Sequence, residues 1–121
     1  MSGAPFILHI APREDWSATT GDLEPASLAT EGFVHCSDPD QVLLPANAMF
    51  AGQTGLLLLV IEAARLTAPL VYEDCYESGM EFPHVYGPLS ADAVVETFAF
   101  EPGADGVFTL PADLVAWLEA R

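Results

Sequence analysis

Two short segments, GFVHCS at residues 32–37 and EFPHVYG at residues 81–87, hold two of the three histidines of this chain. Both are rich in residues that favour extended backbone and carry Gly or Pro at their edges, so we predict two short strands. Successive side chains of a strand point to opposite faces. One face of the two predicted strands is therefore polar and partly aromatic: Phe33, His35, Ser37, Phe82, His84 and Tyr86.

The opposite face of these segments is small and mostly apolar, with Val34 and Cys36 in the first and Pro83 and Val85 in the second. We expect this face to pack into the core of the protein. Because His35 and Cys36 are adjacent, they point to opposite faces, which excludes a catalytic Cys–His dyad.

Convergent polar groups in an apolar setting are typical of small-molecule pockets. The paired faces therefore predict a ligand site at His35, Ser37, His84 and Tyr86. The structural alternative is that each histidine is merely half-buried beside aromatic rings and bonded to a backbone carbonyl. His9 has no comparable neighbours in the sequence, and we expect it to be structural.

Glu73 stands at a predicted strand end, shortly before the second histidine segment. A rigid strand end suits a catalytic carboxylate, which would stabilise a cationic sugar carbon or activate a hydroxyl. A solvated loop carboxylate is the alternative. The candidate catalytic residues are therefore His35, Glu73 and His84.

Two histidines and a carboxylate also bind zinc or iron(II) in many proteins. The sequence contains no HxH, HxxxH or HxxE pair, so it carries no metal-site signature, and we predict no metal. A site built from dispersed ligands stays open as an alternative.

Charge excludes several classes of partner. The chain has 18 Asp and Glu against three arginines, Arg13, Arg65 and Arg121, and a formal net charge of −15. Affinity for nucleic acids and for anionic membranes depends on clustered Lys and Arg, so we expect neither as a partner. The absence of lysine also excludes Schiff-base chemistry and a phosphate-binding P-loop.

Length and composition indicate one domain that spans residues 1–121, with 51% hydrophobic residues for a single core. Cys36 and Cys75 form no CxxC pair, and no secretory signal is recognisable, so we predict reduced thiols in a cytoplasmic protein. The longest apolar run, residues 56–61, is too short to cross a bilayer and is expected to be a buried strand.

The pattern of apolar residues predicts an α+β chain. Strands are expected at residues 6–10, 32–36, 56–61, 70–72 and 93–100, with an edge strand at 107–110. Helices are expected at residues 13–20, 38–50 and 111–120, the second capped by Ser37 and the third opened by Pro111. Pro45 would cost about 3 kcal/mol inside a helix, so the second helix either kinks or begins there.

The order of features along the chain is familiar: Trp16 in the first helix, GFVHCS, Gln41, Phe50-Ala51-Gly52, LLLLVI, Glu73, and FPHVYGPL followed by AVV. Together they resemble the bacterial family called domain of unknown function 952 (DUF952), over residues 5 to about 100. Pro45 and the extension after residue 100 depart from the pattern of that family.

The DUF952 family is similar to the ADP-ribosyltransferase fold, which binds NAD in a cleft of a mixed, split β-sheet. The resemblance implies that fold, flanked by short helices, and NAD as a candidate ligand. It also implies the site residues Trp16, His35, Ser37, Gln41, Glu73, His84 and Tyr86. Fold alone does not fix function.

Three functions stay open at this point. The first is an NAD or ADP-ribose transferase or glycohydrolase-like enzyme, in which His35 and Ser37 bind a ribose, Tyr86 stacks on a ring and Glu73 stabilises the cationic transition state. The second is a small-molecule binding or sensor module without turnover, and the third is a metal-dependent hydrolase. The substrate, the reaction and the oligomeric state are not determined by the sequence.

Overall fold

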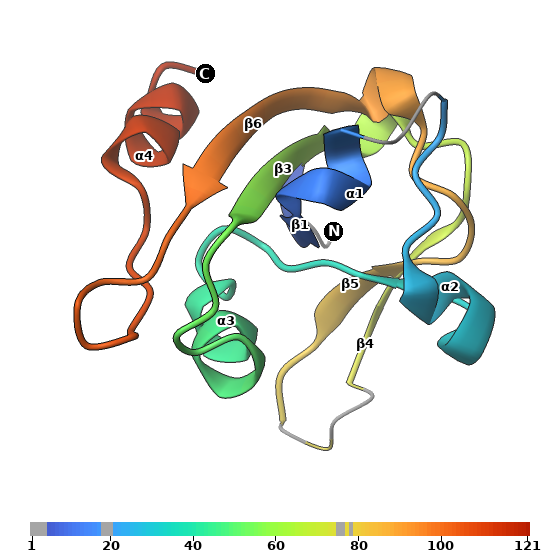
Figure 1. Cartoon of the computed structure of the whole chain (residues 1–121). Coiled ribbons are helices and arrows are strands. Elements are labelled where there is room, and N and C mark those ends of the chain that lie inside the picture. Colours follow the sequence, from blue (N-terminus) through green and yellow to red (C-terminus); the bar gives the residue numbers. More distant parts are fainter. Residues whose placement is uncertain (1–4, 18–20, 75–76, 78) are drawn as a thin grey trace.

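The computed structural model of the chain describes residues 5–17, 21–74, 77 and 79–121. Two sheets and several short helices make up this part of the molecule, which confirms the α+β class (Figure 1). The first sheet has the strand order β1-β3-β6, formed by Phe6–Pro12, Leu56–Glu62 and Val94–Phe100. The second has the order β2-β5-β4, formed by Val34–His35, Phe82–Val85 and Leu70–Glu73.

All strand pairs between the described residues are antiparallel, so the expected mixed sheet is wrong. A reciprocal backbone pair between Leu8 of β1 and Ser37 beyond β2 joins the two sheets. The Leu8 amide donates to the Ser37 carbonyl at 2.7 Å, and the Ser37 amide donates back at 2.8 Å. This pair places β1 beside the GFVHCS segment.

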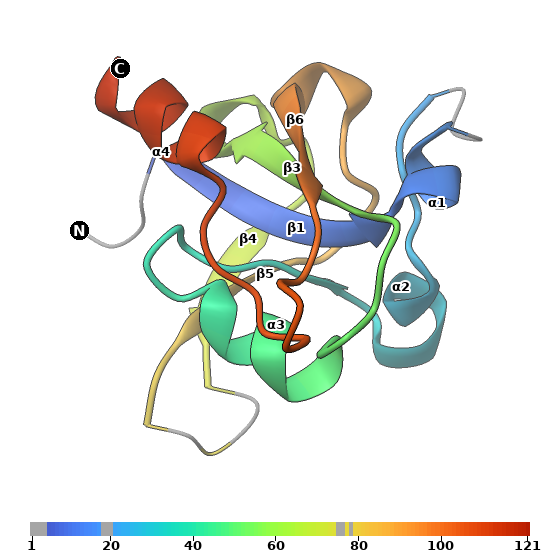
Figure 2. The same cartoon turned by 60° about the vertical axis from the view of Figure 1, so that its left-hand side comes forward.

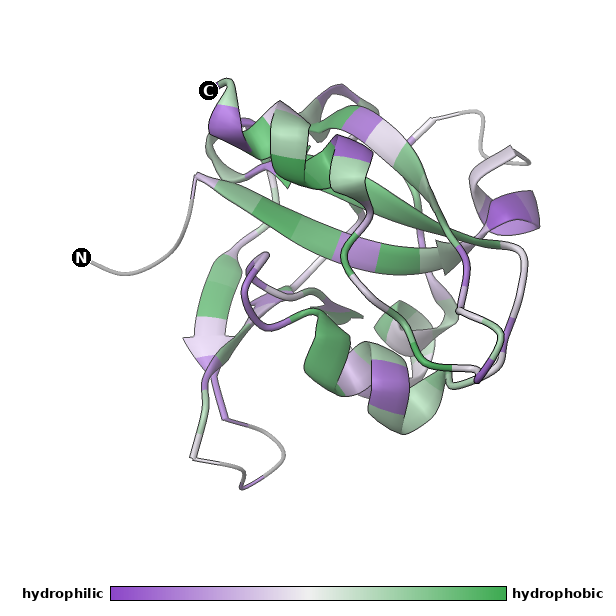
Figure 3. Cartoon of the chain, turned by 90° about the vertical axis from the view of Figure 1, so that its left-hand side faces the viewer, coloured by the Kyte–Doolittle hydropathy of each residue, from purple (hydrophilic) through white to green (hydrophobic). Residues whose placement is uncertain are grey.

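The central strand β3 is apolar on both faces because both faces are covered. Leu57, Leu59 and Ile61 belong to a core cluster between the two sheets, which also contains Val34 and Val85. Alternate residues of β3 belong to a second core cluster, formed with the C-terminal part of the chain: Leu56, Leu58 and Val60. Full burial of each such side chain contributes about 1.5–3 kcal/mol, and Figure 3 shows the strands of the first sheet as mainly hydrophobic.

The described helices are short. They are α1 (Arg13–Ser17), α2 (Ala26–Glu31), α3 (Leu43–Met49) and α4 (Ala112–Glu119), with single 3-10 turns at Ala63–Arg65 and Ala91–Ala93. None of the helices among the described residues has the length and apolar character that a membrane span requires. The end of the predicted first helix, residues 18–20, lies outside the described residues.

The second predicted helix begins later than expected. Residues 38–42 form turns and α3 starts at Leu43, so the prediction of Ser37 as its N-cap is wrong. Ser37 instead uses its backbone to join the sheets. Pro45 falls in the first turn of α3, where a backbone N–H has no partner within the helix, so the proline removes no helical hydrogen bond.

The C-terminal segment packs across α3 and the first sheet before it enters α4 (Figure 2). Residues 107–110 form no strand, so the predicted edge strand is wrong. The Asn47 side chain binds both backbone groups of Phe108, which are then not available to a neighbouring strand. Its Oδ1 accepts from the Phe108 amide at 2.7 Å, and its Nδ2 donates to the Phe108 carbonyl at 3.3 Å. The final helix is confirmed, with Pro111 at its start and Leu114 fully buried.

Candidate functional site

The two histidine segments lie side by side as predicted. His35 of β2 is paired with His84 of β5, and their ring centroids are 5.4 Å apart. Phe33 stacks on His84 at 4.2 Å with an interplanar angle of 18°, and it lies 5.3 Å from Tyr86. The predicted polar and aromatic face therefore exists, and it brings both imidazoles together.

Glu73 joins this face from the end of β4. The His84 ring donates from Nδ1 to Glu73 Oε2 at 2.8 Å, and the Tyr86 hydroxyl donates to the same oxygen. His84 is fully buried. Donation to a carboxylate fixes the proton of neutral His84 on Nδ1 and leaves the lone pair on Nε2, which is the arrangement used to orient a catalytic base.

His35 has a carboxylate of its own. Its Nε2 lies 3.0 Å from Glu31 Oε2, at the end of α2, so the lone pair of neutral His35 is on Nδ1. Gly32, in the left-handed conformation with φ of 87°, ends α2 and turns the chain into β2. This turn brings Glu31 to the same face as His35.

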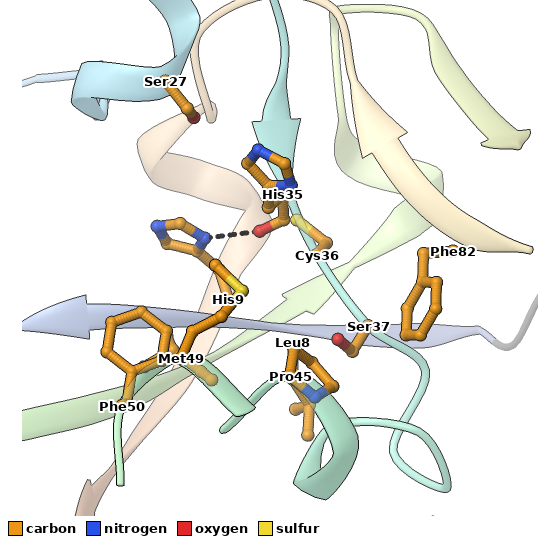
Figure 4. Close-up of a pocket in the computed structure, with 11 residues that line it drawn as sticks. Leu8, His9, Ser27, His35, Cys36, Ser37, Pro45, Met49, Phe50 and Phe82 are labelled. Atoms are coloured by element: carbon orange, nitrogen blue, oxygen red, sulfur yellow. Dashed lines mark hydrogen bonds between the residues drawn. The ribbon is translucent and has the colours of Figure 1, made fainter. Parts of the chain in front are cut away.

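A cavity of about 180 Å³ lies where β1, β2 and α3 meet (Figure 4). Its walls are mainly apolar and include Leu8, Met49, Phe50 and Phe82, while its polar groups include His9, His35 and Ser37. Of the predicted polar and aromatic face, His35, Ser37 and Phe82 border the cavity, whereas Glu73, His84 and Tyr86 do not.

His9 also lines this cavity, which was not predicted from the sequence. Its Nδ1 donates to the backbone carbonyl of His35 at 2.8 Å (Figure 4). If the pairing of β1 with β2 continued, a backbone amide of β1 would bind this carbonyl instead. Burial lowers the pKa of His9, so the ring is neutral at pH 7 and carries its lone pair on Nε2. The signal that could have indicated its burial is its position in a strand between Ile7 and Ala11, whose side chains both face the core.

Two of the predicted ligand residues lie elsewhere. Trp16 packs from α1 against the core cluster between the sheets and is not part of the cavity wall. Gln41 joins two loops: its Oε1 accepts from the Asp38 amide at 3.0 Å, and its Nε2 donates to the Glu81 carbonyl at 2.7 Å. Their placement indicates structural contacts.

Cys36 is buried in the core cluster between the sheets, as predicted, and it also borders the cavity. Burial raises the pKa of its thiol, which keeps it protonated and unreactive. Cys75 lies outside the described residues. No group of three His, Cys, Asp or Glu side chains in the described part of the chain is arranged to hold a metal ion.

The fold and the site define an α+β domain of two small antiparallel sheets with a histidine-lined cavity at their junction. The chain belongs to the family described as Protein of unknown function (DUF952), whose profile matches residues 10–97. The resemblance to DUF952 inferred from the sequence is thereby confirmed.

Solved structures of a bacterial relative agree with this assignment. The crystal structure of protein CC0527 from Caulobacter crescentus is 35% identical, covers 92% of this chain and 98% of its own, and superposes with a TM-score of 0.80. The solution NMR structure of CC0527 is 33% identical over 86% of this chain and 91% of that one, with a TM-score of 0.72. No curated protein matches the chain.

Proposed function

We propose that this protein binds a small ring-containing molecule in the cavity between its sheets and performs acid–base chemistry on it. The observation that carries this proposal is the position of His35, which borders the cavity. Its ring centroid lies 5.4 Å from that of the buried His84, which is bonded to Glu73. Within this proposal His35, whose tautomer is set by Glu31, supplies the acid–base group at the ligand, and the buried His84–Glu73 pair lies beside it outside the cavity wall.

The size of the cavity limits the ligand. Pockets for drug-sized molecules occupy about 300–1,000 Å³, so a cavity of about 180 Å³ takes one ring and a few substituents. Apolar walls from Leu8, Phe50 and Phe82 suit the faces of a ring, while His35 and Ser37 suit a polar group at its edge.

The resemblance to ADP-ribosyltransferases makes nicotinamide the first ring to test, with NAD and ADP-ribose as its larger relatives. An NAD transferase or glycohydrolase reaction, and the fold relationship behind it, stay predictions. Within this proposal, His35 and Ser37 contact the ribose-linked ring, and Glu73 acts through His84.

An NMR titration tests ligand binding. We expect nicotinamide at millimolar concentration to shift the amide signals of His35, Ser37 and Phe82 and to leave those of α4 unchanged. Met49 is 63% exposed at the cavity wall, so Met49→Trp should fold normally and weaken these shifts. Absence of any shift with nicotinamide, NAD and ADP-ribose would contradict the ligand class.

Turnover is tested separately by chromatography of nicotinamide released from NAD. Removal of a general acid or base typically lowers a rate by about 10²–10⁴-fold. We therefore expect Glu73→Gln to abolish measurable release while the amide shifts caused by nicotinamide persist. His35→Ala removes a residue of the cavity wall, so it should abolish release and also weaken these shifts.

A binding module without turnover is the second candidate. It is favoured by the complete burial of His84, whose ring is stacked on Phe33 and bonded to Glu73 within the protein. In that case ligands shift the same amide signals, wild-type protein releases no product, and Glu73→Gln leaves the affinity unchanged.

A further inference from the structure

A second cavity adjoins the first. Its volume is about 580 Å³, and it lies between the end of β1, α1 and residues 23–26. The two cavities share His9 and Ile10 in their walls. His9 therefore borders both cavities and lies within reach of a ligand in either of them.

The polar side chains that line the second cavity are hydrogen-bond acceptors. Asp15 of α1 and Glu24 contribute carboxylates, and the remaining described walls beside His9 are apolar or backbone. No arginine is among the described lining residues, in a chain with a net charge of −15. Two exposed carboxylates alone would be an ordinary solvated surface.

His9 makes the second cavity more specific than its carboxylates do. The side chain is 7% exposed, and its Nδ1 is held by the His35 carbonyl at 2.8 Å. Because Nδ1 carries the proton, the only polar atom that the ring has left for a ligand is Nε2, an acceptor. A ligand group that meets this wall must donate a hydrogen bond.

We infer that the ligand combines an uncharged ring, which fills the first cavity, with a cationic amine that extends past His9 towards Asp15 and Glu24. This inference rests on the proposed function, because it assumes that the ring occupies the first cavity. An ammonium group supplies N–H donors to His9 and positive charge to both carboxylates. An anionic tail would meet acceptors and negative charge in this cavity, so the pyrophosphate of NAD or ADP-ribose would not enter it.

Three small molecules of nearly equal size test the inference by NMR titration: 2-phenylethylamine, 2-phenylethanol and 3-phenylpropanoate. They share the ring and differ in the charge of the tail. We expect the amine to bind about tenfold more tightly than the alcohol, which corresponds to about 1.4 kcal/mol, and the carboxylate to bind most weakly. The advantage of the amine should decrease as salt is added.

Variants of the second cavity provide the control. Asp15→Asn combined with Glu24→Gln should reduce the affinity for the amine to that for the alcohol and leave the alcohol affinity unchanged. Glu14→Gln removes one exposed charge from the same helix but outside the cavity wall, so it should retain most of the preference. His9→Asn keeps a donor for the His35 carbonyl and should also weaken amine binding.

The outcomes separate the inference from the function on which it rests. If the alcohol binds and the amine binds no better, or if the double variant keeps the preference for the amine, the inference is wrong and the ring site stands. If nicotinamide shifts the signals of His35, Ser37 and Phe82 and none of the three compounds does, the inference is wrong and the ring site stands. If neither nicotinamide nor any of the three compounds shifts these signals, the proposed ring site fails and the inference fails with it.

Discussion

Glu73 anchors two side chains of the candidate site with a single carboxylate oxygen. It accepts from His84 Nδ1 at 2.8 Å and from the Tyr86 hydroxyl, and its side chain is 28% exposed. This explains how a fully buried imidazole and a tyrosine that is 39% exposed keep a common orientation. A hydrogen bond to a charged group of this kind contributes about 1.5–3 kcal/mol.

Glu73→Gln should therefore lower the free energy of unfolding by about 1–3 kcal/mol, because an amide oxygen replaces the carboxylate that both donors share. Urea denaturation followed by tryptophan fluorescence measures the difference. Glu81→Gln, an exposed carboxylate in the same part of the chain, is the matched control and should change the value by less than about 0.5 kcal/mol. Equal effects of the two substitutions would contradict the anchoring role.

Burial of His9 gives the stability of the protein a dependence on pH. Its pKa in the folded chain lies below the ordinary value of 6.5, so the unfolded chain binds the proton more readily. The free energy of unfolding should consequently fall as the pH decreases through 6.5 towards the lowered pKa. Thermal melts of wild type and His9→Asn, compared between about pH 7.5 and 5.5, should show a smaller loss in the variant. An identical pH dependence of the two proteins would refute this role.

At the scale of single residues, the sequence predicted which side chains share a face but not all of the contacts they make. Alternation correctly separated His35 from Cys36 and placed His84 with Tyr86. The bond of His9 to the His35 carbonyl agrees with the structural role expected for it, but its position at the cavity was not predicted, because that position depends on the bridge between the sheets. Glu73 was a weak candidate by sequence, since only the strand register brings it to His84.

At the scale of elements, an amide side chain replaces a strand pairing. Asn47 of α3 holds both backbone groups of Phe108, whose ring is buried and stacks on Phe100 at 4.5 Å. The sequence predicted an edge strand at residues 107–110 from its apolar composition. It could not reveal a partner sixty-one positions earlier in the chain.

Asn47→Ala should destabilise the protein by about 1–3 kcal/mol, because the Phe108 amide loses its acceptor. Hydrogen exchange should also show faster exchange of that amide, while β1 and β3 keep their protection. Gln53→Ala, which removes an exposed amide side chain, serves as the control. Unchanged exchange at Phe108 would show that the segment is held by apolar packing alone.

The helices illustrate the same limit. The final helix was predicted well because Pro111 and the spacing of Leu114, Trp117 and Leu118 are local signals. The start of α3 was misplaced, because Ser37 and the acidic residues after it are good helix-start residues in isolation. In the fold, the backbone of Ser37 is already paired with Leu8.

At the scale of the whole molecule, a net charge of −15 on 121 residues implies repulsion within the folded state. Salt screens such repulsion, since the Debye length falls to about 10 Å at 0.1 M. The melting temperature at neutral pH should therefore rise between about 20 mM and 500 mM NaCl. Near the sequence pI of 4.1 the same addition should have little effect, and a salt response of equal size at both pH values would count against repulsion as the cause.

The fold as a whole was predicted in class and in most strands, while the arrangement of the strands was not. The α+β class and the two-sided burial of β3 follow from local patterns. A mixed sheet was inferred from resemblance, and the observed pairs are antiparallel throughout the described residues. Pairing partners far apart in the chain leave no local mark in a single sequence.

The bond pair between Leu8 and Ser37 involves main-chain atoms only, so it does not depend on which side chains stand at these two positions. The two bonds themselves can form with almost any side chain, although the Leu8 side chain is also buried in the core cluster that contains Leu56 and Leu58. Proline is the exception, because a pyrrolidine ring has no amide hydrogen and would remove one of the two bonds. Among small replacements at position 37, a loss of the contact between the sheets with proline but not with alanine would identify this backbone pair as the junction along which the molecule is assembled.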